Sequence, residues 1–76
     1  MRSIFTLKPN RRVDPKAEKD NLEYIVEDVK GVERASFDPE TMKVELEYDE
    51  EDLDFDNTDV IRAIQSNWKF QVVHYA

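Results

Sequence analysis

One stretch of the sequence, residues 14 to 32, has the pattern of a complete amphipathic helix. Asp14 can cap its first turn, and Pro15 suits the first helical position because its missing N–H costs nothing there. A capping box that begins at Asp20 offers a second start, one turn later. Gly31, the only glycine in the chain, can end the helix in a left-handed conformation. The apolar side chains recur at the spacing of one helical face, which must pack on the rest of the chain; they are Leu22, Ile25, Val26 and Val29.

Four segments alternate between apolar and polar residues, as half-buried strands do. The clearest is residues 42 to 48, in which Val44 and Leu46 point to one side and Glu45 and Glu47 to the other. One face of this strand is therefore expected in the core and the other in water. The remaining three strands are expected at residues 4 to 8, 32 to 37 and 70 to 75.

The connections add a hairpin and a second helix. Asp38 followed by Pro39 is typical of a type I turn, which predicts a hairpin over residues 38 to 41. An acidic run at residues 49 to 56 follows the third strand, and in it Leu53 and Phe55 are expected to turn inward. A second helix is expected next, and Asn67 is a suitable end for it. Its first turn can be capped by Asp56, Asn57 or Thr58. The apolar face of that helix is expected to hold Val60, Ile61, Ile64 and Trp68.

The order β-α-β-β-α-β predicts an α+β fold, a ferredoxin-like split βαβ plait. We expect a four-stranded antiparallel sheet in strand order 4-1-3-2, with two helices on one face. In that topology the loop of residues 9 to 13, the turn at 38 to 41 and Lys69 share one end, while Gly31, the acidic run and both termini share the other. Besides one face of the last strand, the expected core contains Phe5, Leu7, Leu22, Val26, Ala35, Phe37, Val44, Leu46, Ile61 and Ile64.

The composition predicts a single acidic domain over residues 1 to 76. With 39% hydrophobic and 38% charged residues, the chain can bury one core but no deep cavity. The net charge is −7, although residues 1 to 19 hold six of the eleven basic residues and only two acids. A mostly negative surface repels phosphate backbones, so no nucleic acid is expected as a partner. Because we find no membrane helix and no signal-peptide pattern, we expect a cytoplasmic protein without membrane insertion.

Several segments follow one another at the spacing of a known family's signatures. They are Gly31-Val32, Ala35, Phe37-Asp38, residues 43 to 49 and residues 60 to 64. Through them nearly the whole chain resembles the heavy-metal-associated (HMA) domain of copper chaperones and of metal-transporting ATPases. The resemblance implies the same plait.

The metal site that the resemblance implies is missing from the sequence. In the family, a Met-x-Cys-x-x-Cys motif before the first helix supplies two thiolates to a soft ion such as Cu(I). Aligned on Gly31, the cysteine positions fall at Pro15 and Glu18 and the methionine position at Val13, and the chain has no cysteine at all. We therefore expect no metal cofactor and no disulfide.

Other candidate sites are weak. Asp52, Asp54 and Asp56 imitate the start of an EF-hand loop, but Asn57 stands where that loop needs glycine. A solvated acidic loop explains them better. His74 is the only histidine, and a zinc site needs three or four donors. We find no nucleophile set and no phosphate-binding loop, so an enzyme is not expected.

A basic cluster remains as the candidate binding site, at the end where the resemblance places the metal and the docking of partners. Its residues are Arg11, Arg12, Lys16 and Lys69. A positive patch on a strongly negative protein favours binding to an acidic surface of another protein. An ordinary solvated loop is the alternative interpretation.

We therefore expect a non-catalytic HMA-like domain that has lost the cysteine metal site and acts as a protein–protein interaction module. It would be a monomer or a weak dimer without a cofactor. Two alternatives stay open: a small-ligand-binding regulatory plait, which would form a stable dimer, and a residual metal-related role inherited from the family.

Overall fold

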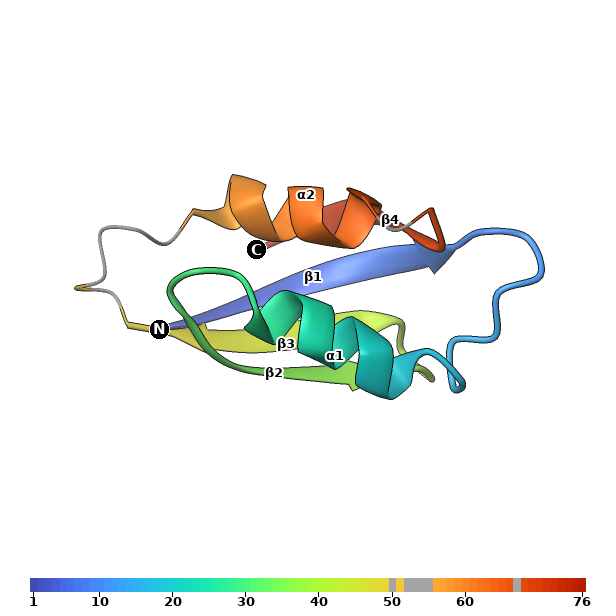
Figure 1. Cartoon of the computed structure of the whole chain (residues 1–76), viewed down its shortest axis with the longest axis horizontal. Coiled ribbons are helices and arrows are strands. Elements are labelled where there is room, and N and C mark those ends of the chain that lie inside the picture. The colour runs from blue at the N-terminus through green and yellow to red at the C-terminus, as the bar shows by residue number, and fades with distance from the viewer. Residues whose placement is uncertain (50, 52–55, 67) are drawn as a thin grey trace.

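Six elements follow one another along the chain in the predicted order (Figure 1). The computed structural model describes residues 1–49, 51, 56–66 and 68–76. The predictions for Leu53, Phe55, Asn67, Asp52 and Asp54 lie outside these residues. None of the helices in the described part is long and apolar enough to cross a membrane. The elements are β1 (Arg2–Pro9), α1 (Lys19–Glu27), β2 (Val32–Asp38), β3 (Lys43–Tyr48), α2 (Asn57–Ser66) and β4 (Phe70–Tyr75).

The strands form one antiparallel sheet in the order β2-β3-β1-β4, which confirms the predicted topology. β1 and β3 pair at the centre, with Phe5 opposite Val44. β4 pairs with the other side of β1, and the register shifts by one residue between Thr6 and Leu7. Such a β-bulge changes which side chains of β4 face the core. β2 and β4 are therefore the two edges of the sheet.

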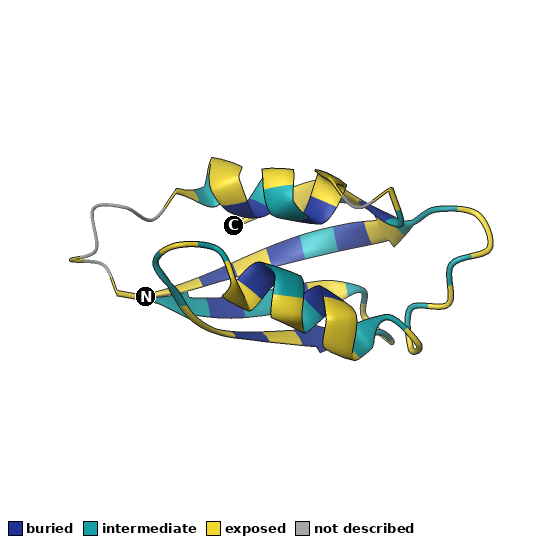
Figure 2. Ribbon diagram, in the orientation of Figure 1, coloured by how far each residue is buried: buried dark blue, intermediate teal, exposed yellow. Residues whose placement is uncertain are grey.

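Both helices cover the same face of the sheet, and the core lies between them and alternate residues of the strands (Figure 2). Ile61 was predicted in this core but is only partly buried, whereas Val60 is fully buried. Both are apolar neighbours on α2, and the periodic pattern did not distinguish them. Trp68 lies beyond the end of α2 and is 66% exposed. The buried apolar residues are Phe5, Leu7, Leu22, Val26, Ala35, Phe37, Val44, Leu46, Val60, Ile64 and Phe70.

The opposite face of the sheet is open and carries ion pairs between strands. Arg2 lies 2.8 Å from Glu45 of β3, and Arg34 of β2 lies 2.9 Å from Glu47. The hydrogen bond from Arg34 lowers the pKa of Glu47, and the charge of Arg34 acts in the same direction. The outward orientation predicted for both glutamates is confirmed.

The first helix is shorter at its start than predicted. Asp14 accepts a hydrogen bond from the Lys16 N–H at 3.1 Å, but the chain then forms a separate turn before α1 begins at Lys19. Glu18, with φ −97° and ψ 0°, lies in the bridge region instead of the helical one. The turn therefore does not continue into the helix. The Asp20 capping box is also wrong, since no side chain caps α1.

The end of the helix was also predicted too late. α1 ends at Glu27, and the next residues form a turn closed by a hydrogen bond of 3.1 Å from the Val32 N–H to the Val29 oxygen. Gly31 is the third residue of this turn and has φ 93°. Its positive φ is confirmed, although the glycine shapes the turn and not the last turn of the helix.

The hairpin and the second helix start largely as predicted. Asp38 accepts hydrogen bonds from Glu40 at 2.9 Å and from the Met42 N–H at 2.8 Å. Met42, predicted as a strand residue, lies in the turn with φ 60°, so the turn is one residue longer than a type I turn. Among the three candidate caps of α2, Asp56 accepts the Thr58 N–H at 2.9 Å.

Candidate functional site: the loop end

The connection after β1 and the hairpin turn lie at one end of the molecule (Figure 1), and the backbone of Lys69 joins that connection there, as predicted. The Asn10 N–H donates a hydrogen bond to the Lys69 oxygen at 2.9 Å. At the opposite end, the N-terminal ammonium of Met1 donates to the Tyr48 oxygen at 3.0 Å. We call residues 10–18, 39–42 and 68–69 the loop end, and the opposite end the terminal end.

At the loop end, an ion pair joins the turn before α1 to the connection before β4. Lys69 Nζ lies 2.9 Å from Glu18 Oε1, and the two side chains are only 28% and 22% exposed. The hydrogen bond from Lys69 lowers the pKa of the Glu18 carboxyl, helped by the charge of Lys69 and by Asn21 and opposed by desolvation. Glu18 therefore stays ionised and ties the turn before α1 to the connection before β4.

This ion pair occupies the place where the resemblance puts a metal ion. Pro15, at the first cysteine position, has no side-chain donor, and Glu18, at the second, already binds an ammonium group. A metal ion at this site would have to displace Lys69. Its only ligand from the two cysteine positions would then be the carboxylate of Glu18, where the family has two thiolates. The residues present do not fit a soft metal ion. Val13, at the methionine position, packs against the core.

The other predicted binding residues differ from Lys69 because they are exposed to solvent. Arg11, Arg12 and Lys16 are exposed, and no ion pair involves them in the part of the chain that the structure describes. The structure therefore separates the predicted cluster into two parts. Lys69 holds the loop end together, and the remaining three cations, which we call the basic loop, face solvent.

Arg12 adopts a backbone conformation that is unusual for its residue type. The Val13 N–H donates to the Asn10 oxygen at 3.2 Å, and Arg12, the third residue of this turn, has φ 66°. A residue with a Cβ pays about 1–2 kcal/mol in this region, where glycine pays little. This conformation could not be predicted from the residue type, because neither glycine nor asparagine stands at the position.

The sequence also missed an exposed aromatic residue beside the basic loop. Trp68, predicted on the apolar face of the second helix, lies at the rim of a surface groove of about 430 Å³. Its position after the helix end and before β4 was the only signal of its exposure. Tryptophan is enriched among the residues that dominate protein interfaces. The groove is lined by Asn10, Gln65, Trp68, Phe70, Gln71 and Val72.

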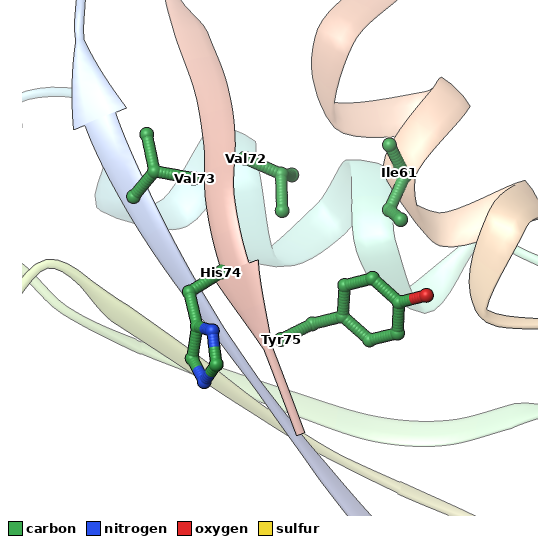
Figure 3. Close-up of a pocket in the computed structure, with 5 residues that line it drawn as sticks. All are labelled: Ile61, Val72, Val73, His74 and Tyr75. Carbon is green, nitrogen blue, oxygen red and sulfur yellow. The ribbon is translucent and has the colours of Figure 1, made fainter.

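A second hollow of about 280 Å³ lies between α2 and the rest of β4 (Figure 3). Val72 and Tyr75 point toward Ile61 of α2, while Val73 and His74 point away from it. His74 is exposed, and among the described residues no group of three or more His, Asp or Glu side chains is placed to hold a metal ion. This hollow is apolar apart from His74 and the Tyr75 hydroxyl.

Comparison with known proteins gives a clear answer for the fold. No protein-family model matches the sequence, and no curated protein matches it significantly. Among solved structures, the CopZ metallochaperone is similar with a TM-score of 0.77 and 20% identity, over 96% of this chain and 100% of that one. A copper-binding domain from HMA7, a P-type ATPase, is similar with a TM-score of 0.70 and 15% identity, over 99% and 97%.

The copper chaperone of Enterococcus hirae in its apo form gives a TM-score of 0.66 and 19% identity, over 93% of this chain and 98% of that one. The matches cover almost the whole of each protein, so the similarity extends to every element and not to a shared motif alone. The chain therefore has the HMA-type ferredoxin-like fold of copper chaperones and copper-binding ATPase domains, without a single cysteine in its sequence.

Proposed function

We propose that this chain is a non-catalytic protein-interaction domain that uses the basic loop to bind an acidic surface of a partner protein. One observation carries the proposal: Arg11, Arg12 and Lys16 are all exposed along one connection of a protein with net charge −7. Cations that form no ion pair among the described residues are available to pair with carboxylates of another protein, and complementary charge raises both association rate and specificity.

The strained backbone of Arg12 supports this proposal. A conformation that costs about 1–2 kcal/mol persists only where the surrounding structure holds it, and such positions cluster at functional sites. Trp68 adds a large apolar contact at the rim of the neighbouring groove. The loop end thus combines arginine and tryptophan, two of the residue types that are enriched among the residues dominating interface energies.

The proposed function does not include the copper binding of the structurally similar proteins. Two thiolates are replaced by Pro15 and by the Glu18–Lys69 ion pair. What remains of the shared architecture is an exposed loop between the first strand and the first helix. We propose that this loop still binds a partner protein but carries no metal ion.

The test is affinity capture from the native extract, with quantitative mass spectrometry of the recovered proteins. Wild type is compared with the charge reversal Arg11→Glu/Arg12→Glu. The matched control is Lys43→Glu/Arg62→Glu, which changes the net charge equally at two exposed positions outside the basic loop. We expect the loop variant to lose partners that the control retains, with recovery that falls as salt rises. Equal recovery by all three proteins would contradict the proposal.

A further inference from the structure

The two edges of the sheet are protected differently. At the β2 edge, carboxylates of α1 accept outward N–H groups: Glu23 binds the Phe37 N–H at 2.7 Å, and Glu27 binds the Ala35 N–H at 3.4 Å. Charged groups on an edge strand prevent its pairing with another chain. The β2 edge is therefore closed to a further strand.

The β4 edge has weaker protection. Its Val72 N–H donates to the neutral side chain of Gln65 at 3.2 Å. Farther along, Ala76 exchanges two hydrogen bonds with Ile4 of β1, at 2.9 and 3.0 Å. Because backbone groups alternate in direction along a strand, those of the preceding Tyr75 point away from β1. No side chain caps them within the described residues, so this half of the edge is open.

The side chains of β4 suit pairing with a second strand. The sequence FQVVHY contains no Asp, Glu, Lys, Arg, Gly or Pro and is rich in residues that favour strands. Val73 is 57% exposed and Tyr75 50% exposed. In a protein with 38% charged residues, this neutral strand is the place where two copies meet without bringing carboxylates together.

The distribution of charge along the molecule selects the partner. β4 starts at the loop end, beside the basic loop, and finishes toward the terminal end, where α2 begins. Asp56, which precedes α2, and Asp59 in its first turn are both exposed there. Antiparallel pairing of two β4 strands places the loop end of each copy beside the terminal end of the other. The basic loop of one copy then faces Asp59 in the first turn of α2, and the preceding cap Asp56, in its partner.

We infer that a second copy of this chain covers the β4 edge, forming a two-fold dimer in which two antiparallel β4 strands join the sheets. The contact is isologous, so it closes on itself and does not propagate into a fibre. It buries the exposed Val73 and the hollow between Ile61 and Tyr75. The dimer is weak, because each copy carries a net charge of −7 and Gln65 competes for one backbone donor.

Sedimentation equilibrium of the full chain, from micromolar to millimolar concentration, tests this inference. The mass should rise from 9.0 kDa to twice that value. Val73→Lys, at an exposed position, should weaken the dimer by about tenfold or more because two lysines meet across the edge. Ser36→Lys adds the same charge to an exposed position of β2 and should leave the dimer unchanged.

A charge exchange tests the pairing direction without relying on Val73. Arg11→Glu/Arg12→Glu and Asp59→Lys should each weaken the dimer, and a mixture of these two variants should form a heterodimer more readily than either forms a homodimer. Backbone amide NMR signals of Val73 and Tyr75 should shift with concentration in the wild type. A monomer at millimolar concentration, or a dimer that survives Val73→Lys unchanged, would overturn the inference.

Discussion

Two turns of this molecule are closed by the same type of backbone hydrogen bond and have a residue with positive φ at the third position, but that residue differs. At the terminal end, residues 29 to 32 form a turn closed by one hydrogen bond, and its third residue is Gly31 with φ 93°. At the loop end, residues 10 to 13 form a turn closed in the same way, and its third residue is Arg12 with φ 66°. The chain uses its only glycine for the first turn and accepts strain in the second.

This difference separates a structural position from a candidate functional one. Glycine relieves the steric clash of a left-handed residue, and arginine does not. A side chain kept at a cost to stability is expected where the side chain itself has a use. The cations of the loop end differ in the same way. Lys69 forms an ion pair with Glu18, whereas the cations of the basic loop are exposed.

The largest expected effect comes from returning thiolates to the loop end. The Glu18 N–H donates to the Pro15 oxygen at 3.3 Å, so both residues belong to one turn. Pro15→Cys/Glu18→Cys should therefore create a Cu(I) site, measured by competition with a chromogenic chelator. The wild type and the control Pro15→Ser/Glu18→Ser should not compete. Tight binding of one Cu(I) by the wild type would refute the account of the lost metal site.

Substitution of the relaxed turn should have the next largest effect. Gly31→Ala should lower the free energy of unfolding by about 1–2 kcal/mol, because a Cβ is unfavourable at positive φ. Urea unfolding followed by circular dichroism measures it. A neutral result would show that this turn adjusts to a side chain and would remove the contrast with Arg12.

The strained turn should respond in the opposite direction. Arg12→Gly should raise the free energy of unfolding by about 0.5–1 kcal/mol, the relief of strain less the added freedom of the unfolded chain. The neighbouring Arg11→Gly, which removes the same charge at a residue without positive φ, is the matched control and should not stabilise. If both variants behave alike, charge and not backbone strain explains the result.

The smallest expected effect is the pH dependence contributed by Glu18. Its folded pKa lies below the ordinary value of 4.5 because of the hydrogen bond from Lys69. Its contribution to stability is therefore fully present above pH 4.5 and is lost as the pH falls through the folded pKa. The stability difference between wild type and Glu18→Gln should shrink from pH 6 to pH 3. A difference that stays constant over this range would contradict the role of the ion pair.

The sequence was sufficient for features that depend on neighbouring residues. Alternation placed Val44 and Leu46 inside and Glu45 and Glu47 outside, and the turn signal at Asp38 located the hairpin. The order of strands and helices predicted the correct fold, and the resemblance implied the same one.

Features that depend on distant residues were not predictable in this way. Glu18 interrupts the expected helix with a bridge conformation and pairs with Lys69, which lies 51 positions away. The residue types at the bulge in β4 and at Arg12 do not predict either the bulge or the strained backbone. For the same reason the predicted basic cluster contained Lys69, whose structural partner appears only in three dimensions.

We propose that Arg12 is kept in a strained conformation because its side chain binds a partner. Affinity capture with Arg12→Gly, performed beside its urea unfolding curve and with Arg12→Lys as a charge-preserving control, tests this most directly. We expect Arg12→Gly to be more stable than the wild type and to recover fewer partner proteins, and Arg12→Lys to recover more of them than Arg12→Gly. A stabilised Arg12→Gly protein that recovers the same partners in the same amounts as the wild type would contradict it.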